Sequence, residues 1–268
     1  MRNWDELAAP WLKHEARMEA AHAPVLDRMM AAAGPMTGQR VLDIGIGSGG
    51  STLRAVAAGA MPTGIDIAPP FLRRAAARLP QGIALFQGDA GRYPFPASQF
   101  DAAISIFGTM FFEDTKSAFA NIKAALRPAA RFTFAAWASP ADNPWLSLAG
   151  AATIAVLGAP AEPPDPAAPG PFRFADPAMP LAALSAAGWS NATVTTTELF
   201  LTPDGSPADI AATQLDLGIA ARRVKEEAAS ADQVAQIKAR ITEGYAAMCD
   251  ATGAVRVPAK VHIFQALA

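Results

Sequence analysis

The sequence predicts an α/β protein built around a mostly parallel, doubly wound sheet. Short apolar runs typical of buried strands alternate along the chain with segments whose apolar residues recur at helical spacing. The clearest apolar run, 40–44, passes directly into a glycine-rich turn and then into a helix start. This order is typical of a buried parallel strand followed by the helix that covers it.

Composition indicates a globular protein with a sizeable core. The chain has 268 residues, 51% of them hydrophobic and 17% charged, which suits one large domain or a domain with a small lobe. A formal net charge of −2 gives no electrostatic reason to expect nucleic acid or an anionic membrane as a partner. No signal peptide core or membrane-spanning run is apparent, so we expect a cytoplasmic protein without stable membrane insertion, either a monomer or a homodimer.

The single cysteine, Cys249, excludes a disulfide framework within the chain and a multi-cysteine zinc site. We expect no metal. Because Cys249 lies near the end of a helical pattern, we expect it to be a small buried side chain.

The first 35 residues contain two helical patterns and no strand. Asn3, followed by Glu6, predicts a cap for the first helix, which presents Trp4 and Trp11 on one face. The second helical pattern ends near Gly34.

The turn after the first strand fits two nucleotide-binding patterns. Gly45, Gly47 and Gly50 match G-x-G-x-x-G, which is typical of dinucleotide sites, whereas Gly45, Gly47 and Gly49 match G-x-G-x-G preceded by Asp43. A carboxylate at this position would oppose a pyrophosphate but favour a ligand that carries a sulfonium and an ammonium. The charge of Asp43 therefore favours the second pattern.

The run 43–49 resembles motif I of the class I S-adenosylmethionine (SAM)-dependent methyltransferases. Asp66 ends the next predicted strand and could accept both ribose hydroxyls, a feature shared with dinucleotide sites. The resemblance assigns Asp89, after the third strand at 83–86, to the adenine amino group and the Ala90 backbone to the ring edge. The cofactor-binding residues predicted on this basis are Asp43, Gly45, Ile46, Gly47, Gly49, Asp66, Ile67, Phe71, Gly88, Asp89, Ala90 and Phe107.

The fourth predicted strand, 102–106, ends in an apolar run at 107–112 that is expected to line a pocket in part. Asp114 is expected to cap the following helix, which must end before Pro128. Residues 128–131 replace the Pro-Gly-Gly turn usual in the resembling family, which suggests a turn without positive φ. The fifth strand, 132–137, follows.

Aromatic and amide side chains beyond this strand suit a small-molecule pocket. An ordinary packed connection is the alternative interpretation. The acceptor-binding residues predicted are Trp11, Met110, Phe111, Trp137, Asn143 and Trp145.

The C-terminal half predicts further helices at 146–157 and up to Gly188, and a strand at 192–197. Ser206 and Ser230 are expected to open two more helices before the closing strand at 255–267. A proline-rich segment, 159–171, predicts a stiff extended loop.

The resemblance implies a seven-stranded, mostly parallel Rossmann-like sheet with an antiparallel last strand. It also implies a helical lid at 1–35 on a domain at 36–268, with insertions at about 138–180 and 203–252 forming an acceptor-side cap. The chain looks most similar to the group that includes the ubiquinone and menaquinone C-methyltransferases.

The expected reaction is transfer of the methyl group from SAM to a small-molecule acceptor by in-line displacement, with release of S-adenosylhomocysteine. No catalytic residue is assigned; the possible general bases by residue type are His14, His22, Tyr93 and His262. Two alternatives stay open: a nicotinamide-dependent Rossmann oxidoreductase and a non-catalytic SAM-binding protein.

Overall fold

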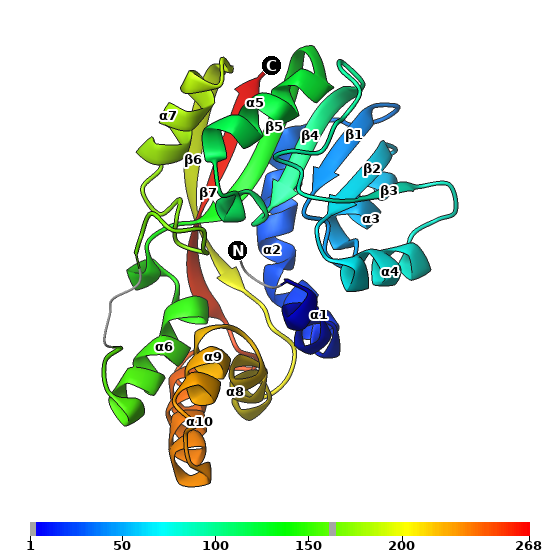
Figure 1. Cartoon of the computed structure of the whole chain (residues 1–268). Helices are drawn as coiled ribbons and strands as arrows, with labels where there is room; N and C mark the ends of the chain where they lie inside the picture. Colours follow the sequence, from blue (N-terminus) through cyan, green and yellow to red (C-terminus); the bar gives the residue numbers. More distant parts are fainter. Residues whose placement is uncertain (1–3, 161–164) are drawn as a thin grey trace.

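The computed structural model describes residues 4–160 and 165–268. Its centre is one seven-stranded sheet in the order β3-β2-β1-β4-β5-β7-β6 (Figure 1). Strands β1 to β5 pair in parallel, and β7 pairs antiparallel with both β5 and β6. The predicted sheet is confirmed. The strands are β1 (Arg40–Ile44), β2 (Met61–Asp66), β3 (Ala84–Gln87), β4 (Phe100–Ile106), β5 (Leu126–Trp137), β6 (Ser190–Leu201) and β7 (Val257–Leu267).

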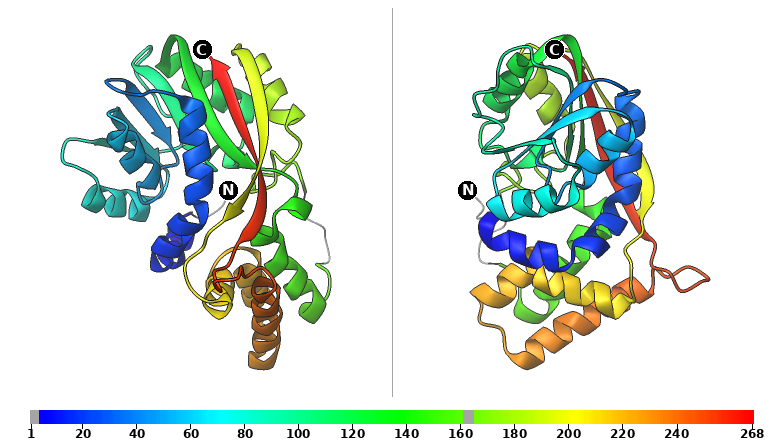
Figure 2. Two further views of the ribbon diagram at one scale, coloured as in Figure 1. Left: turned by 180° about the vertical axis from the view of Figure 1, so that it is seen from behind. Right: turned by 90° about the vertical axis from the view of Figure 1, so that its right-hand side faces the viewer.

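Helices cover both faces of the sheet (Figure 2). α2 packs on β5, β6 and β7 and touches α3, whereas α5 and α7 contact each other on the opposite face. The Asp114 side chain accepts from the backbone N–H of Ser117, so the predicted cap of α5 is confirmed. The helices next to the sheet are α1 (Trp4–Lys13), α2 (Glu15–Ala33), α3 (Gly50–Ala57), α4 (Pro69–Arg78), the 3-10 helix η1 (Thr109–Phe111), α5 (Thr115–Ala125) and α7 (Ala178–Ala186).

A bundle of four further helices lies beyond the carboxyl ends of the parallel strands (Figure 1). α10 packs on α8 and α6, and α9 packs on α6 and α8. Capping boxes at Ser206 and Ser230 confirm the two predicted helix starts. This bundle, together with the 3-10 helix η2 (Pro140–Asp142), consists of α6 (Pro144–Leu157), α8 (Pro207–Asp216), α9 (Gly218–Glu226) and α10 (Ala231–Ala246).

The sequence did not predict α9. Its buried face consists of Ala220 and Arg223 with the partly buried Ile219 and Val224, a short apolar stripe interrupted by a charged side chain. Gly218 at its start has φ +76°, which separates it from α8.

Two local expectations are wrong. Ala129 has φ +65°, although the turn after α5 was expected to avoid positive φ. In this conformation the Ala129 N–H donates to the Ala268 carbonyl, which ties the turn to the end of β7. Cys249 is exposed rather than buried, because it lies beyond the end of α10 in a bridge with Val255.

Asn3 and residues 161–164 of the proline-rich segment lie outside the described residues. Within the described ranges, no helix combines the length and the apolar character needed to cross a membrane. In the same ranges, no group of three or more His, Cys, Asp and Glu side chains is arranged to hold a metal ion.

Candidate active site

The predicted site residues follow one edge of the sheet. Because β3, β2, β1, β4 and β5 are neighbours in that order and run in parallel, their carboxyl ends meet at this edge. Asp89 follows β3, Asp66 ends β2, the glycine turn follows β1, Phe107 follows β4 and Trp137 ends β5. The edge thus carries carboxylates at one end and aromatic rings at the other.

The glycine turn follows a path that side chains would obstruct. Gly45, Gly47 and Gly49 have φ values of +69°, +53° and +92°, the left-handed region that favours glycine. A Cβ on Gly45 would lie 3.2 Å from the Cα of Gly108, so the turn fits tightly against the end of β4. Gly50, the third glycine of the alternative pattern, instead starts α3 without a positive φ.

Asp43 lies under this turn and is fully buried. Its Oδ2 accepts hydrogen bonds from the hydroxyls of Ser51 and Thr52, both at 2.7 Å, whereas its buried Oδ1 has no partner within the described part of the chain. Burial raises the pKa of Asp43 to about 6. A buried carboxylate with an unpartnered oxygen fits a cationic ligand, because positive charge nearby would favour its ionised form.

We expect SAM binding to weaken as the pH falls through 6. Because burial raises the pKa of Asp43 to about 6, its side chain is ionised in most molecules at pH 7.5 but neutral in most molecules at pH 5. The neutral form has no charge to attract a sulfonium. Affinity should be up to about tenfold lower at pH 5 than at pH 7.5, because roughly nine-tenths of such a group is protonated one unit below its pKa. Calorimetry across this range tests the expectation.

Asp43→Asn should remove the part of the pH dependence that comes from Asp43. Burial also raises the pKa of Asp66, so any pH dependence left in the variant is assigned to Asp66. An Asp43→Asn variant whose SAM affinity follows pH as in the wild type would contradict a role for the Asp43 charge. Asp101→Asn is the control, because Asp101 lies at the opposite end of β4 and pairs with Arg127.

Asp66 is 8% exposed and holds two neighbouring segments. Its Oδ2 accepts from the Gly47 N–H at 2.8 Å and its Oδ1 from the Ala68 N–H at 2.9 Å. Each carboxylate oxygen can accept a second hydrogen bond. Asp66 could therefore hold the glycine turn and two ligand hydroxyls together.

Asp89 marks the far end of the row of carboxylates. Its Oδ1 accepts from the Gly91 N–H at 2.8 Å, and its side chain lines a cavity of about 160 Å³ together with Phe112 and Ala118. Ala90 beside it is buried, and the Gly88 N–H donates to the Asp66 carbonyl at 2.9 Å, which joins the ends of β2 and β3.

Two predicted cofactor residues contribute in different ways. The Ile46 side chain packs with Ala75 and Leu79 in a small apolar cluster behind the turn, so its backbone is the part left to face a ligand. Ile67, directly after Asp66, is partly exposed at the sheet edge.

Helix α1 lies over the residues that follow Asp66. Ala8 of α1 forms a small buried cluster with Ala68 and Phe71 of the next segment. Trp11 meets the Phe71 ring edge to face at a centroid distance of 6.3 Å. Trp11 also packs against the main core, and α1 is a covering element held by few apolar side chains.

The corner between α1 and α2 is attached to α8. Asp216 Oδ2 accepts from Lys13 Nζ at 2.6 Å and lies 2.7 Å from His14 Nε2. Arg17 Nη1 donates to the Thr213 hydroxyl at 2.7 Å. Three side chains within five residues, Lys13, His14 and Arg17, thus join the N-terminal helices to the helical bundle.

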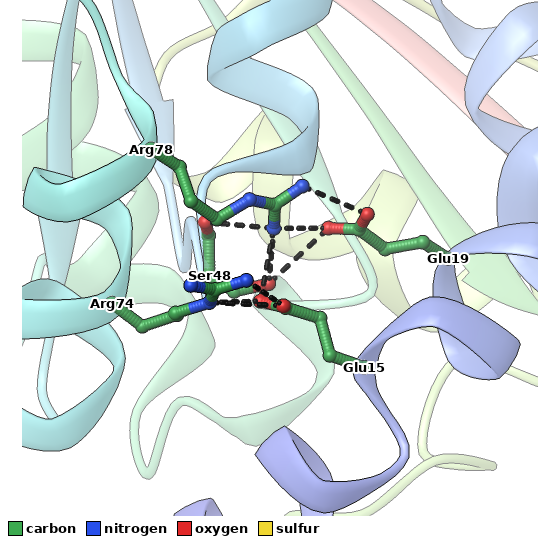
Figure 3. A network of polar contacts seen from close by, with 5 residues as sticks. All are labelled: Glu15, Glu19, Ser48, Arg74 and Arg78. Atoms are coloured by element: carbon green, nitrogen blue, oxygen red, sulfur yellow. Dashed lines mark hydrogen bonds and ion pairs between the residues drawn. The ribbon is translucent and has the colours of Figure 1, made fainter.

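A network of charged side chains supports the glycine turn from behind (Figure 3). Arg78 Nη1 donates to both the carbonyl and the hydroxyl of Ser48, at 3.1 Å each, and Arg78 Nη2 donates to Glu19 Oε2 at 2.9 Å. Arg74 pairs in turn with Glu15. The network connects α2, the glycine turn and α4.

We expect Arg78→Ala to weaken SAM binding several-fold and to lower the free energy of unfolding by about 1 kcal/mol, the scale of partly exposed ion pairs in a network. The Arg78 side chain is 18% exposed, so water screens it only in part. Calorimetry and urea unfolding measure the two effects. Arg54→Ala removes the exposed Arg54–Asp27 pair and should change neither; equal effects of both variants would contradict a supporting role.

Aromatic rings gather at the β4 and β5 end of the edge. Phe107, with a φ of +61°, stacks on Trp137 at a centroid distance of 4.1 Å. Positive φ in a bulky residue is uncommon and is often found at ligand sites. His22 of α2 lies edge to face against both rings, at 5.3 and 5.7 Å. With two further rings, 6.2 Å from His22, they form the aromatic cluster: Trp11, His22, Phe107, Trp137 and Trp145.

The other predicted acceptor residues lie elsewhere. Asn143 is fully buried; its Nδ2 donates to the carbonyls of Ser139 and Lys260, and its Oδ1 accepts from the Lys260 N–H. These bonds give it a structural role at the start of α6. Met110 is buried in the main core, and Phe111 meets Trp4 at a centroid distance of 4.9 Å.

Of the possible general bases, only His22 lies in the aromatic cluster. His14 is bound to Asp216 and Thr213, and His262 is hydrogen-bonded to Thr196 on β6. Tyr93 stacks on Phe86 beside β3.

Sequence reasoning missed the Arg78 network, although a signal was present. Glu15 and Glu19 are four residues apart on α2, as Arg74 and Arg78 are on α4. Each pair therefore lies on one helix face, and complementary pairs of this kind suit contact between two helices.

Comparisons with known proteins agree with this geometry. Residues 41–129 match the family described as "Methyltransferase domain". The uncharacterized protein Rv1405c of Mycobacterium tuberculosis is 35% identical over 122 residues, 44% of each chain. The demethylmenaquinone methyltransferase of Corynebacterium kroppenstedtii is 31% identical over 106 residues, 40% of this chain and 45% of that protein. The matched region thus spans less than half the length of these relatives.

The fold has solved counterparts at low sequence identity. Phosphoethanolamine N-methyltransferase 2 of Haemonchus contortus, in complex with S-adenosyl-L-methionine, matches with a TM-score of 0.55 at 17% identity, over 91% of this chain and 52% of that one. Residues 41–129 thus match a methyltransferase domain, demethylmenaquinone methyltransferases are among the relatives, and the sheet that contains these residues has the fold of the solved methyltransferase.

Proposed function

We propose that the protein transfers a methyl group from SAM to a small-molecule acceptor and releases S-adenosylhomocysteine. The observation that carries the proposal is the order of side chains along the sheet edge. Asp89, Asp66 and the glycine turn follow one another from β3 to β1, which suits adenine, ribose and the amino-acid end of one extended ligand. The aromatic cluster then lies where an acceptor would meet the sulfonium.

The residues of this chain would act by binding, alignment and exclusion of water. SAM, when bound, supplies an electrophilic methyl group. Asp66 would hold the ribose, and the unpartnered oxygen of Asp43 would favour the positive end of the donor. Alignment and desolvation can provide most of the acceleration of such a displacement, and the rings of the cluster exclude water on the acceptor side.

The location of the helical bundle supports a small acceptor. Helices from both predicted insertions, α6 and α8 to α10, pack together beyond the aromatic cluster, and Trp145 of α6 belongs to both. In this proposal the bundle is the acceptor-side cap, and α1 is a lid over the nucleoside end.

Methyl-labelled SAM tests the proposal directly. The full chain is incubated with labelled SAM and a cell extract, and the label is followed into small-molecule, protein and RNA fractions. We expect label in the small-molecule fraction, together with calorimetric binding of SAM and S-adenosylhomocysteine but not NADH. Label in the protein or RNA fraction would overturn the small-molecule acceptor.

The same experiment separates the rival functions. NADH binding without SAM binding would establish an oxidoreductase, against which the unpartnered Asp43 oxygen under the turn argues. SAM binding without any labelled product would establish a non-catalytic binding protein.

A further inference from the structure

The Nε2 nitrogen of His22 is a feature of the aromatic cluster that packing does not explain. Part of the residue reaches the surface, but Nε2 is buried and has no hydrogen-bond partner among the described residues. Buried polar groups in folded proteins nearly always have a partner. At the edge of a ligand site, an unpartnered nitrogen indicates where a polar group of the ligand would bind.

The surroundings of His22 select the chemistry of that group. The ring centroids of the four other members of the aromatic cluster lie 5.3 to 6.2 Å from the His22 ring centroid, and none of these side chains is charged. A carboxylate placed there would lose its hydration without gaining a counter-charge. A flat, uncharged ring carrying a hydroxyl matches both the rings and the single nitrogen.

The location of His22 brings it to the reacting end of the donor. Gly45 of the glycine turn lies against Gly108, which follows Phe107 directly. The aromatic cluster therefore starts immediately beside the turn, on the side away from Asp66 and Asp89. A donor held with its ribose at Asp66 presents its sulfonium toward this side.

Resting on the proposed function, we infer that His22 is a catalytic residue whose Nε2 accepts the hydroxyl proton of a planar phenol held within the aromatic cluster. The imidazole then has its own proton on Nδ1. As methyl transfer proceeds, an oxygen lone pair forms the new oxygen–carbon bond, and the carbon–sulfur bond breaks with its electron pair left on sulfur. The hydroxyl proton moves to Nε2 and passes later to solvent.

Burial supports the neutral state that this role requires. It lowers the pKa of His22 to about 4, so the free imidazole is neutral at pH 7, and its tautomer with the proton on Nδ1 leaves Nε2 free to accept. The O–H group becomes more acidic as the oxygen bonds to carbon, which matches a weak base that accepts the proton only during transfer.

The test uses the full chain loaded with S-adenosylhomocysteine and labelled with ¹⁵N in its histidine rings, with 2-naphthol as the acceptor probe. The chain has three histidines, so His14→Gln and His262→Gln assign the other two resonances and serve as internal controls. We expect 2-naphthol to shift the His22 Nε2 resonance and to leave His14 and His262 unchanged. No binding of 2-naphthol, or binding without a shift at Nε2, would overturn the inference.

Activity with labelled SAM and 2-naphthol gives the second readout. His22→Phe preserves the ring packing and His22→Asn retains a smaller polar group. Both should lose about 100-fold or more in kcat, the scale of general-base catalysis, with SAM affinity unchanged. Wild-type rates in His22→Phe would overturn the role. Calorimetry keeps the two proposals distinct. Absence of SAM binding in the wild type would overturn the proposed function. SAM binding together with unchanged kcat in the His22 variants would overturn only this inference.

Discussion

Replacing Asp66 with Ala should weaken SAM binding by about 3 kcal/mol, roughly 100-fold in Kd. Two ligand hydroxyls would lose a charged acceptor, and each hydrogen bond to a charged group contributes about 1.5–3 kcal/mol. The variant also frees the N–H groups of Gly47 and Ala68, which Asp66 holds in the ligand-free protein. Calorimetric titration with SAM measures the loss.

A conservative variant and a control variant show whether that loss comes from the Asp66 carboxylate. Asp66→Asn keeps one acceptor oxygen and should show an intermediate loss. Asp27→Ala removes an exposed carboxylate that pairs with Arg54 and should bind SAM normally. Unchanged affinity in Asp66→Ala would exclude Asp66 from the ribose site.

Trp145→Ala should lower the free energy of unfolding by about 3–5 kcal/mol, the range for truncating a buried tryptophan. Trp145 is 1% exposed, and its ring lies 6.1 Å from that of Tyr245 on α10. Its carbonyl also accepts from Gln214 Nε2 at 3.1 Å on α8. The residue thus joins three helices of the bundle to the aromatic cluster, and its loss leaves a cavity between them.

Urea unfolding followed by far-UV circular dichroism measures this effect. Trp145→Phe should recover most of the stability, because it restores much of the ring volume. Trp4→Ala is the matched control: Trp4 is only partly buried on α1, so its truncation should cost much less. Equal losses for Trp4 and Trp145 would contradict the central place of Trp145 in the bundle.

The features that the sequence predicted correctly are those encoded by neighbouring residues. The first strand and its turn lie within one short segment, and Ser206 with Asp209 forms a capping box over four residues. Asp66 could be placed because a strand and the prolines after it fix where it ends. Periodicity and turn chemistry suffice for such elements.

Three features that it did not predict depend on residues distant in the chain. The conformation of Ala129 follows from a hydrogen bond to Ala268, and the role of Asn143 from three bonds that involve Ser139 and Lys260. His22 stands out only once β4, β5 and α6 bring their rings around it. No local pattern in the sequence carries these relations.

The attachment of Lys13 and His14 to Asp216 constrains how the protein can open. If α1 swings away to uncover the nucleoside end, it must either break these contacts or carry α8 with it. If the contacts break, α1 moves alone and uncovers only the proposed donor site. If α1 and α8 move together, the proposed donor and acceptor sites are uncovered at the same time. If α1 and the bundle cover donor and acceptor as proposed, this joint of three side chains links the opening of one site to the opening of the other.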